Sequence, residues 1–259
     1  MNRFTVLLHK DLIESIRKHR LLVLVLVFLM FGILSPVTAK YLPEIVSLIL
    51  SSVGEMPDFG IAIPDPVMND SYVQYYKNMT QMGIFIQILV MMGIVSEEKR
   101  KGSAVLILTK SVSRLEFLLS KFVMSVTVIM VSMIPSFVSF YLYTWLLFDE
   151  KPLPGAFAGI GIFALLMIFI MSLTFFASTV ARSAAISAMI AIGGYFSVSL
   201  ISAIPKISDY FPMYLLDAAY QISIGVSGAG PFIPAILITA GVIVLLFVLS
   251  ALSFRYQEL

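Results

Sequence analysis

Residues 155–181 read GAFAGIGIFALLMIFIMSLTFFASTVA, a run without a charged side chain. A helix needs about 20 apolar residues to cross the roughly 30 Å hydrocarbon core of a bilayer. The run is long enough, so it predicts a membrane-spanning helix. Residues 122–148, 183–205 and 218–254 are likewise free of charged side chains.

The composition of the whole chain agrees with this interpretation. Of the 259 residues, 59% are hydrophobic and 12% are charged, and the mean hydropathy is +1.00. Soluble domains carry about 25% charged residues, so this chain cannot cover a globular surface in water. A soluble enzyme, a disordered tail and a nucleic-acid-binding protein are therefore excluded. The chain has no cysteine, which excludes disulfides, thiolate metal sites and cysteine nucleophiles.

Six segments are long and apolar enough to span a membrane, and they predict an all-α polytopic membrane protein. The third is longer than a bilayer requires, which indicates tilt, a kink at Pro135 or an extension beyond the membrane. The six are Leu21 to Ala39, Met79 to Ser96, about Phe117 to Phe148, Gly155 to Ala181, Ala184 to Ile204 and Pro231 to Leu252.

The distribution of Lys and Arg predicts the orientation. If the N-terminus is cytoplasmic, the outer segments hold only Lys40, Lys77, Lys151 and Lys206 of the 17 Lys and Arg residues. The positive-inside rule therefore places both termini in the cytoplasm. We expect one transmembrane domain over residues 1–259, multi-pass in the cell membrane of a prokaryote.

The segments outside the spans carry their own patterns. In residues 1–20, apolar side chains recur every three or four positions, which predicts an amphipathic helix in the inner interface; a soluble extension of the first span is the alternative.

The extracytoplasmic segments are residues 40–78 and 205–230. Prolines in the former are expected to break any helix, leaving 45–50 as a short helix on the outer face. Aromatics in the latter indicate an interfacial belt or, alternatively, a substrate gate.

Residues 97–121, EEKRKGSAVLILTKSVSRLEFLLSK, are the most informative stretch between spans. Gly102 permits a left-handed turn, and Ser103 can cap a short helix over residues 104–109. Ser113 and Glu116 form a capping box that starts the next helix. A short helix between two turns suits the groove of a partner protein, whereas the alternative is an ordinary solvated loop. We take residues 97–116 as this hairpin.

The sequence lacks the residues that nucleotide binding, nucleophilic catalysis and metal binding would require. No phosphate-binding P-loop occurs, so the chain offers no energy source of that kind. Both histidines, His9 and His19, precede the first span, so the spans hold no Ser-His pair or His-rich metal site. The 15 methionines more often serve packing than Cu(I) binding. We expect no enzyme activity, no catalytic residue, no metal and no cofactor on this chain.

Small residues recur every four positions in the fifth span, a spacing that lets helices approach closely. Packing within one chain and contact with a second copy explain this pattern equally well. The residues are Ser183, Ala184, Ser187, Ala188 and Ala191.

Three stretches resemble the permease subunits of type-2 ABC transporters of the exporter class, and more narrowly their six-span NosY-like branch. Residues 10–36 resemble the elbow helix leading into the first span. Residues 64–93 resemble the outer segment and second span, and 97–122 resemble the inner hairpin. Ser111 stands where the family usually has proline.

The resemblance implies a separate ATPase subunit that binds ATP and magnesium, and a transporter made of two copies of each subunit, or of this chain with a homologous permease. It also implies that the hairpin is the coupling helix between ATPase and spans. Substrate identity is not readable. A membrane scaffold or assembly factor and an ATP-independent channel or facilitator remain the rival functions. The expected coupling residues are Glu97, Glu98, Gly102, Leu108, Ser113, Arg114 and Lys121.

Overall fold

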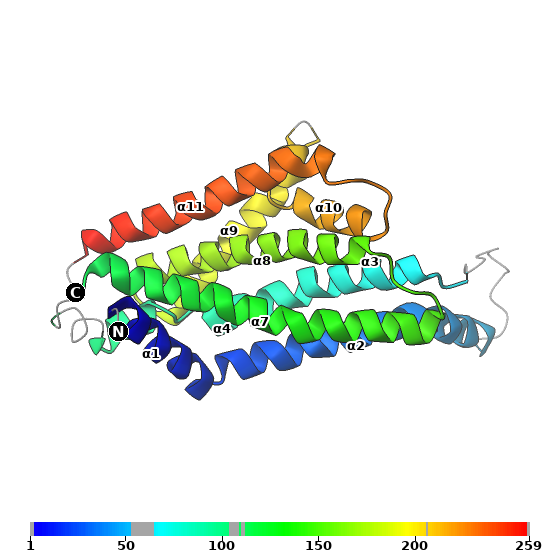
Figure 1. Ribbon diagram of the computed structural model, residues 1–259, viewed down its shortest axis with the longest axis horizontal. Coiled ribbons are helices and arrows are strands. Elements are labelled where there is room, and N and C mark those ends of the chain that lie inside the picture. Colours follow the sequence, from blue (N-terminus) through cyan, green and yellow to red (C-terminus); the bar gives the residue numbers. More distant parts are fainter. Residues whose placement is uncertain (1–2, 53–64, 104–108, 110–111, 206, 258–259) are drawn as a thin grey trace.

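The computed structural model describes residues 3–52, 65–103, 109, 112–205 and 207–257. This described part consists of helices joined by turns and loops, without a β-strand (Figure 1). The elements are α1 (Arg3–Arg17), α2 (Arg20–Ser52), α3 (Met68–Asn78), the π-helix η1 (Met79–Gly83), α4 (Ile84–Met91), α5 (Ser96–Arg100), α7 (Arg114–Phe148), α8 (Gly155–Val180), α9 (Ala184–Ser202), the short 3₁₀ helix η2 (Ser208–Tyr210), α10 (Tyr214–Ser223), the 3₁₀ helix η3 (Gly230–Phe232) and α11 (Ile233–Arg255).

Within the described residues, six helical stretches are long and apolar enough to cross a membrane, which confirms the predicted number of spans and the all-α class. They are Arg20–Ile49, Met68–Arg100, Arg114–Phe148, Gly155–Val180, Ala184–Ser202 and Gly230–Arg255. Both termini lie at one end of the bundle, called the terminal end below, and the opposite end is called the far end (Figure 1). The side of the membrane that each end faces stays a prediction.

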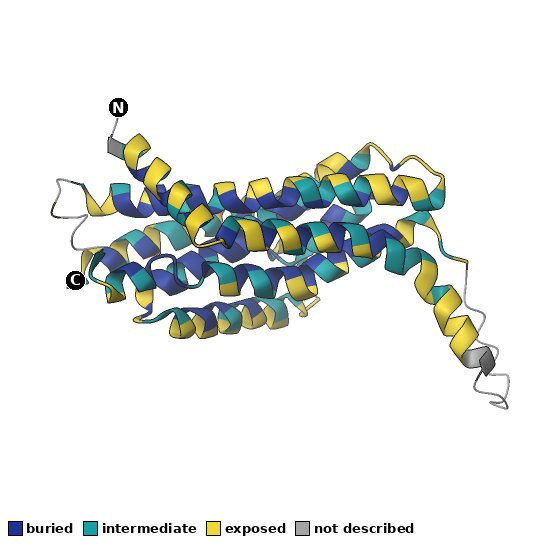
Figure 2. Cartoon of the chain, turned by 90° about the horizontal axis from the view of Figure 1, so that it is seen from below, coloured by how far each residue is buried: buried dark blue, intermediate teal, exposed yellow. Residues whose placement is uncertain are grey.

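Helix α8, formed by the uncharged run, occupies the centre of the bundle. It packs against α4, α7, α9, α10 and α11, and its large side chains Phe163, Leu166 and Met167 are fully buried. A helix that is apolar on every side is stable when other helices or lipid surround it. The peripheral helices differ from α8 because their outward faces are exposed (Figure 2), and many of the exposed side chains are hydrophobic.

Helix α2 corrects the prediction that prolines end the first span. The helix continues through Pro36 and Pro43 to Ser52, so residues 45–50 are not a separate helix. Proline removes one backbone hydrogen bond, but long apolar helices in membranes tolerate the loss. Beyond the prolines the helix turns away from the bundle and is exposed (Figure 2).

Helices α2 and α7 meet at a close backbone contact. A Cβ atom at Gly32 would collide with the backbone oxygen of Ser136. The Ser136 hydroxyl donates a 2.7 Å hydrogen bond to the carbonyl of Phe28. Small and hydroxylated residues at such contacts are typical of helices packed inside membranes.

The second span begins at Met68 rather than at Met79, so the predicted outer segment is partly helical. Helix α3 is polar in sequence, but its three tyrosines are buried, and two of them find hydroxyl partners on other helices. Tyr75 Oη lies 3.2 Å from Ser136 Oγ, and Tyr76 Oη lies 2.7 Å from Ser223 Oγ. The π-helix η1 then joins α3 to α4.

The predicted N-terminal helix is confirmed as α1, which meets α2 at a sharp bend. His19 at the bend has a φ of 57°, a left-handed conformation uncommon outside glycine. The bend directs α1 across the terminal end, where it packs against α7 (Figure 1).

Candidate functional site

A buried ion cluster joins the start of the hairpin to two helices at the terminal end. Lys121, on the second turn of α7, is 2% exposed. Its Nζ atom lies 2.6 Å from Oε1 of Glu98 on α5 and 3.3 Å from Oδ1 of Asp11 on α1. Ser120 Oγ donates a 2.7 Å hydrogen bond to Asp11 Oδ2. A buried charge is tolerated only when paired in this way, so the contact fixes α1, α5 and α7 to one another.

Further charges surround the buried trio at the rim. Lys10 Nζ lies 3.4 Å from Asp11 Oδ1, 3.4 Å from Glu14 Oε2 and 3.5 Å from Glu98 Oε1. Lys18 Nζ lies 2.6 Å from Glu14 Oε1 and 3.6 Å from Glu97 Oε2.

Arg20 extends this rim to the first turn of α2. One of its guanidinium nitrogens lies 3.9 Å from Glu97 Oε2. The C-terminal half of α1, the first turn of α2 and the hairpin carboxylates therefore share one network of alternating charges.

The network shifts the ionisation of its members outside the spans. Burial alone would raise the pKa of Glu14. The hydrogen bond from Lys18 and the charges of Lys121, Lys18 and Lys10 outweigh it and lower the pKa from 4.5 to about 2. Burial alone would lower the pKa of Lys10, but the carboxylates of Glu98, Asp11 and Glu14 raise it overall. Both shifts favour the charged forms and hold the ion pairs together at neutral pH.

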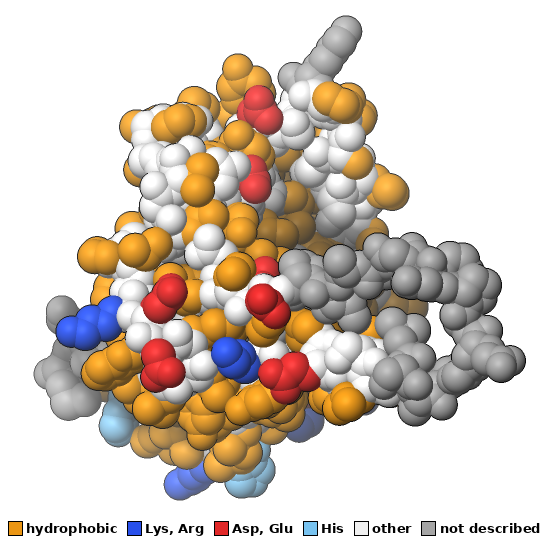
Figure 3. All heavy atoms as spheres, turned by 90° about the vertical axis from the view of Figure 1, so that its right-hand side faces the viewer, with side chains coloured by type: hydrophobic (Ala, Val, Ile, Leu, Met, Phe, Trp, Pro, Cys, Tyr) orange, Lys and Arg blue, Asp and Glu red, His pale blue; other side chains and the backbone are white. Residues whose placement is uncertain are grey.

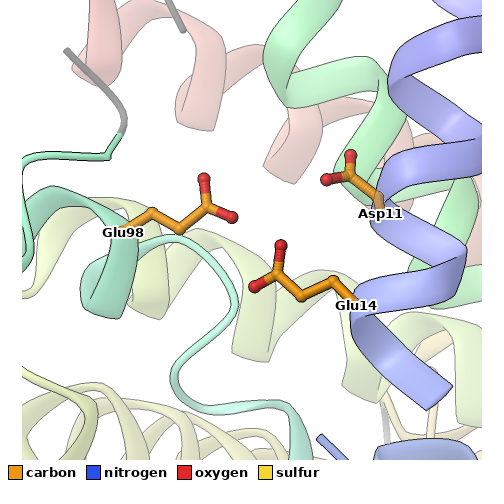
Figure 4. Close-up of side chains that lie close together, drawn as sticks. All are labelled: Asp11, Glu14 and Glu98. Carbon is orange, nitrogen blue, oxygen red and sulfur yellow. The ribbon is translucent and has the colours of Figure 1, made fainter. Parts of the chain in front are cut away.

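The three carboxylates have a spacing that would suit a metal ion. Figure 4 shows Asp11, Glu14 and Glu98 pointing toward one another from α1 and α5, and their ligand atoms lie within 4.8 Å. The ammonium of Lys10, however, lies within hydrogen-bonding or ion-pair distance of all three. Lysine side chains thus supply the positive charge that these carboxylates require.

The two ends of the hairpin have the turn chemistry predicted from the sequence. Gly102 has a φ of 69°, and its N–H donates a 3.1 Å hydrogen bond to the carbonyl of Lys99. The capping box is also confirmed: the N–H of Glu116 donates to Ser113 Oγ at 3.1 Å, and the N–H of Ser113 donates to Glu116 Oε2 at 2.9 Å. The predicted short helix and Leu108 lie outside the described residues, apart from Thr109.

Arg114 binds the end of the last helix. Its Nη1 donates to the carbonyls of Phe254 (2.9 Å), Arg255 (2.7 Å) and Gln257 (3.1 Å). The last carbonyls of a helix have no partner within the helix, so Arg114 supplies one for α11. The ring of Phe117 stacks on Phe254 with centroids 5.7 Å apart. The start of α7 and the C-terminal end of α11 therefore form one unit.

Lys99 makes a second connection to the C-terminal residues. Its Nζ donates to the carbonyl of Thr179 at the end of α8, and to Gln257 Oε1 at 3.0 Å. Gln257 Nε2 donates to the same Thr179 carbonyl at 3.2 Å. The hairpin is thereby tied to α8 as well as to α11.

The structure brings most of the predicted coupling residues together and adds members that sequence reasoning missed. Glu98 and Lys121 contact each other, Glu97 lies at the rim, and Gly102, Ser113 and Arg114 form the ends of the hairpin. Asp11 was missed although it lies between Leu7 and Ser15, at four-residue spacing along the buried face of α1. An acidic residue on an otherwise apolar face was the signal that could have indicated it.

The small residues of α9 are used within the chain. Ser187, Ala188 and Ala191 are buried against the rest of the bundle, at 0%, 7% and 0% exposure. Ser183 caps α9 by accepting a hydrogen bond from the N–H of Ile186 at 3.4 Å, and Ala184 is half-buried at its first position. This burial favours packing within one chain, one of the two alternatives that the sequence left open.

The fold defines the class of the protein, an all-α polytopic membrane protein whose described residues form six candidate spans. A sequence model described as "ABC-2 family transporter protein" matches residues 55–252. The chain therefore belongs to the ABC-2 family of transporter membrane components. It is similar to the "Uncharacterized transmembrane protein YxlG" of Bacillus subtilis (strain 168), with 26% identity over 260 residues that cover 100% of this chain and 99% of the relative.

Proposed function

We propose that the chain is the permease subunit of an ABC exporter, driven by a separate ATPase subunit that docks on the hairpin of residues 97–116. Family membership supports the permease role. The observation that carries the coupling is the buried contact between Lys121, Glu98 and Asp11. A force on the hairpin would pass through this contact to α1 and α7 rather than being lost in a loose loop.

The hairpin has rigid connections on both sides. Glu98 ties its first arm to α1 and α7, while Arg114 ties its second arm to α11. Closure of an ATPase dimer would thereby move several spans at once. A transition between two packings of the spans, biased by nucleotide on the partner, is a recognised form of switching. In this proposal two copies of the permease act together in a bacterial cell membrane, with the terminal end cytoplasmic and the substrate leaving at the far end.

The test is capture of a candidate ABC ATPase by the purified permease in lipid nanodiscs. We expect the wild-type chain to bind the ATPase, and Gly102→Pro to abolish binding because proline cannot adopt a φ of 69°. Gly228→Ala is the matched control, since a Cβ there meets no atom within 4 Å. Equal capture by the Gly102→Pro variant would overturn the docking site.

Substrate-dependent ATP hydrolysis in the reconstituted complex then separates transport from scaffolding. A permease stimulates hydrolysis when cargo is present and moves it across the vesicle membrane. Hydrolysis that no cargo changes, with the complex intact, would favour the scaffold. Passage of cargo without ATPase or nucleotide would favour a channel.

A further inference from the structure

A second site lies toward the far end of the bundle, away from the ion cluster. A cavity of about 590 Å³ opens between α3, η1, the end of α9 and α10. This volume is within the range that holds drug-sized ligands. Its lining combines the apolar Val73 and Leu216 with the rings of Tyr214 and Tyr220. Figure 3 looks onto the far end, whose surface is hollowed between raised parts and carries acidic side chains among hydrophobic ones.

The cavity carries charges at its opening. Lys77 and Asp217 both line it and both are exposed. Asp209 lies close by, because the charges of Asp209 and Asp217 both contribute, after burial, to raising the pKa of Tyr214. Among the residues that the structure describes, none of these three charges makes an ion pair. The carboxylate of Asp217 and the rings of Tyr214 and Tyr220, all from α10, favour a positively charged group.

One lining residue of the cavity carries a polar atom without a partner. Thr80 lines it, is 7% exposed, and its Oγ1 has no hydrogen-bond partner within the described ranges. A buried polar atom without a partner is costly and calls for an explanation. Thr80 belongs to the π-helix η1, and π-helical turns occur frequently at functional sites.

We propose that this cavity binds an amphiphile whose head group carries an amine or ammonium, with the head at Asp217 and the tyrosine rings and the apolar part against Leu216 and Val73. The inference rests on the proposed function for its meaning, since the bound amphiphile would be the exported cargo. Two sources share this chemistry: a zwitterionic membrane lipid and a cationic amphiphile. The phosphate of a lipid would also engage Lys77, whereas a cationic amphiphile would not need that side chain.

The test is equilibrium binding of radiolabelled dodecyltrimethylammonium to the purified chain in nanodiscs of phosphatidylglycerol, without any ATPase. We expect saturable binding that Asp217→Asn weakens about three- to tenfold. Leu216→Trp should abolish it by filling the cavity. Glu150→Gln, which removes an exposed acid at the far end but outside this cavity, should leave it unchanged. Dodecyl sulfate should not compete.

A second arm identifies the source. Phosphatidylethanolamine is added as a competitor, and Lys77→Gln is compared with the wild type. Competition that is lost in Lys77→Gln indicates the lipid, and competition that is absent throughout indicates a cationic amphiphile; both uphold the site. Binding that survives Asp217→Asn and Leu216→Trp unchanged, or that dodecyl sulfate competes for through Lys77, overturns it. Asp217 is exposed, so its variant tests the idea even if Leu216→Trp misfolds. Because no ATPase is present, failure here leaves the coupling proposal standing, and loss of ATPase capture leaves this one standing.

Discussion

The ammonium nitrogen of Lys121 lies 2.6 Å from Glu98 Oε1, and both side chains are almost entirely buried. One residue opens the hairpin and the other lies just beyond it on α7. Their pairing closes the base of the hairpin. Because neither charge has bulk water to solvate it, each depends on the other.

Lys121→Met is expected to destabilise the chain by about 3–5 kcal/mol, because Asp11 and Glu98 would lose their buried counter-charge. Thermal unfolding in detergent measures the loss. The double variant Glu98→Gln with Lys121→Met should lose less than the sum of the two single variants. Strict additivity of the three measurements would contradict the pairing.

The folded chain should lose stability in acid through Glu14. The pKa of Glu14 is lowered in the folded protein from 4.5 to about 2, so its contribution is fully present above about pH 4.5. It is lost progressively as the pH falls toward 2. Glu14→Gln should remove about 1–3 kcal/mol of this pH dependence. Unfolding temperatures across the acid range test the effect, with Glu150→Gln, an exposed acid outside the ion cluster, as the control.

Arg114→Gln should loosen the end of α11. The variant loses charge-assisted hydrogen bonds to the carbonyls of Phe254, Arg255 and Gln257, and we expect a cost of about 1.5–3 kcal/mol. Hydrogen exchange should rise in residues 250–257 but not at the far end. Arg182→Gln, an exposed arginine near the same end, provides the comparison. Unchanged protection of the C-terminal residues in Arg114→Gln would count against the cap.

Gly32→Ala should separate α2 from α7. The added Cβ would meet the backbone oxygen of Ser136, which cannot move without shifting the helix. Overpacking of this kind costs about 1–3 kcal/mol. Gly161→Ala is the matched control, since no atom lies within 4 Å of a Cβ there. A melting temperature for Gly32→Ala equal to that of the control would show that the helices adjust freely.

The sequence predicted the number of membrane spans better than the residues at which the helices begin and end. Charge-free runs such as residues 155–181 identify spans directly. An α-helix satisfies its own backbone hydrogen bonds, so a single apolar segment can cross the bilayer as a helix. The prediction that Pro43 breaks the helix was wrong. Proline usually disrupts a helix interior, but the apolar sequence around Pro43 allows α2 to continue. Residues 68–78 were placed in the outer segment, because the hydroxyl partners of their tyrosines, Ser136 and Ser223, lie far away in the sequence and leave no local signal.

The candidate site was predicted only in part, because a single sequence shows local motifs but not contacts between distant residues. Turn chemistry is local, so Gly102 and the Ser113 capping box were identified and confirmed. The pairing of Glu98 with Lys121 depends on how α5 meets α7, and the part of Asp11 depends on how α1 folds back at His19. Such contacts between distant residues leave no spacing pattern in a single sequence.

The π-helix at Met79–Gly83 sets the angular phase of the whole second span. A π-turn holds one residue more than an α-helical turn, and each residue in a helix advances by about 100°. Removing a single amino acid from this turn would restore an uninterrupted helix and rotate α3 by roughly that angle against α4. Tyr75 and Tyr76 would swing off their serine partners, and the wall of the far cavity would turn with them. The extra residue in η1 thus allows α3 and α4 to present different faces to their neighbours within one transmembrane span.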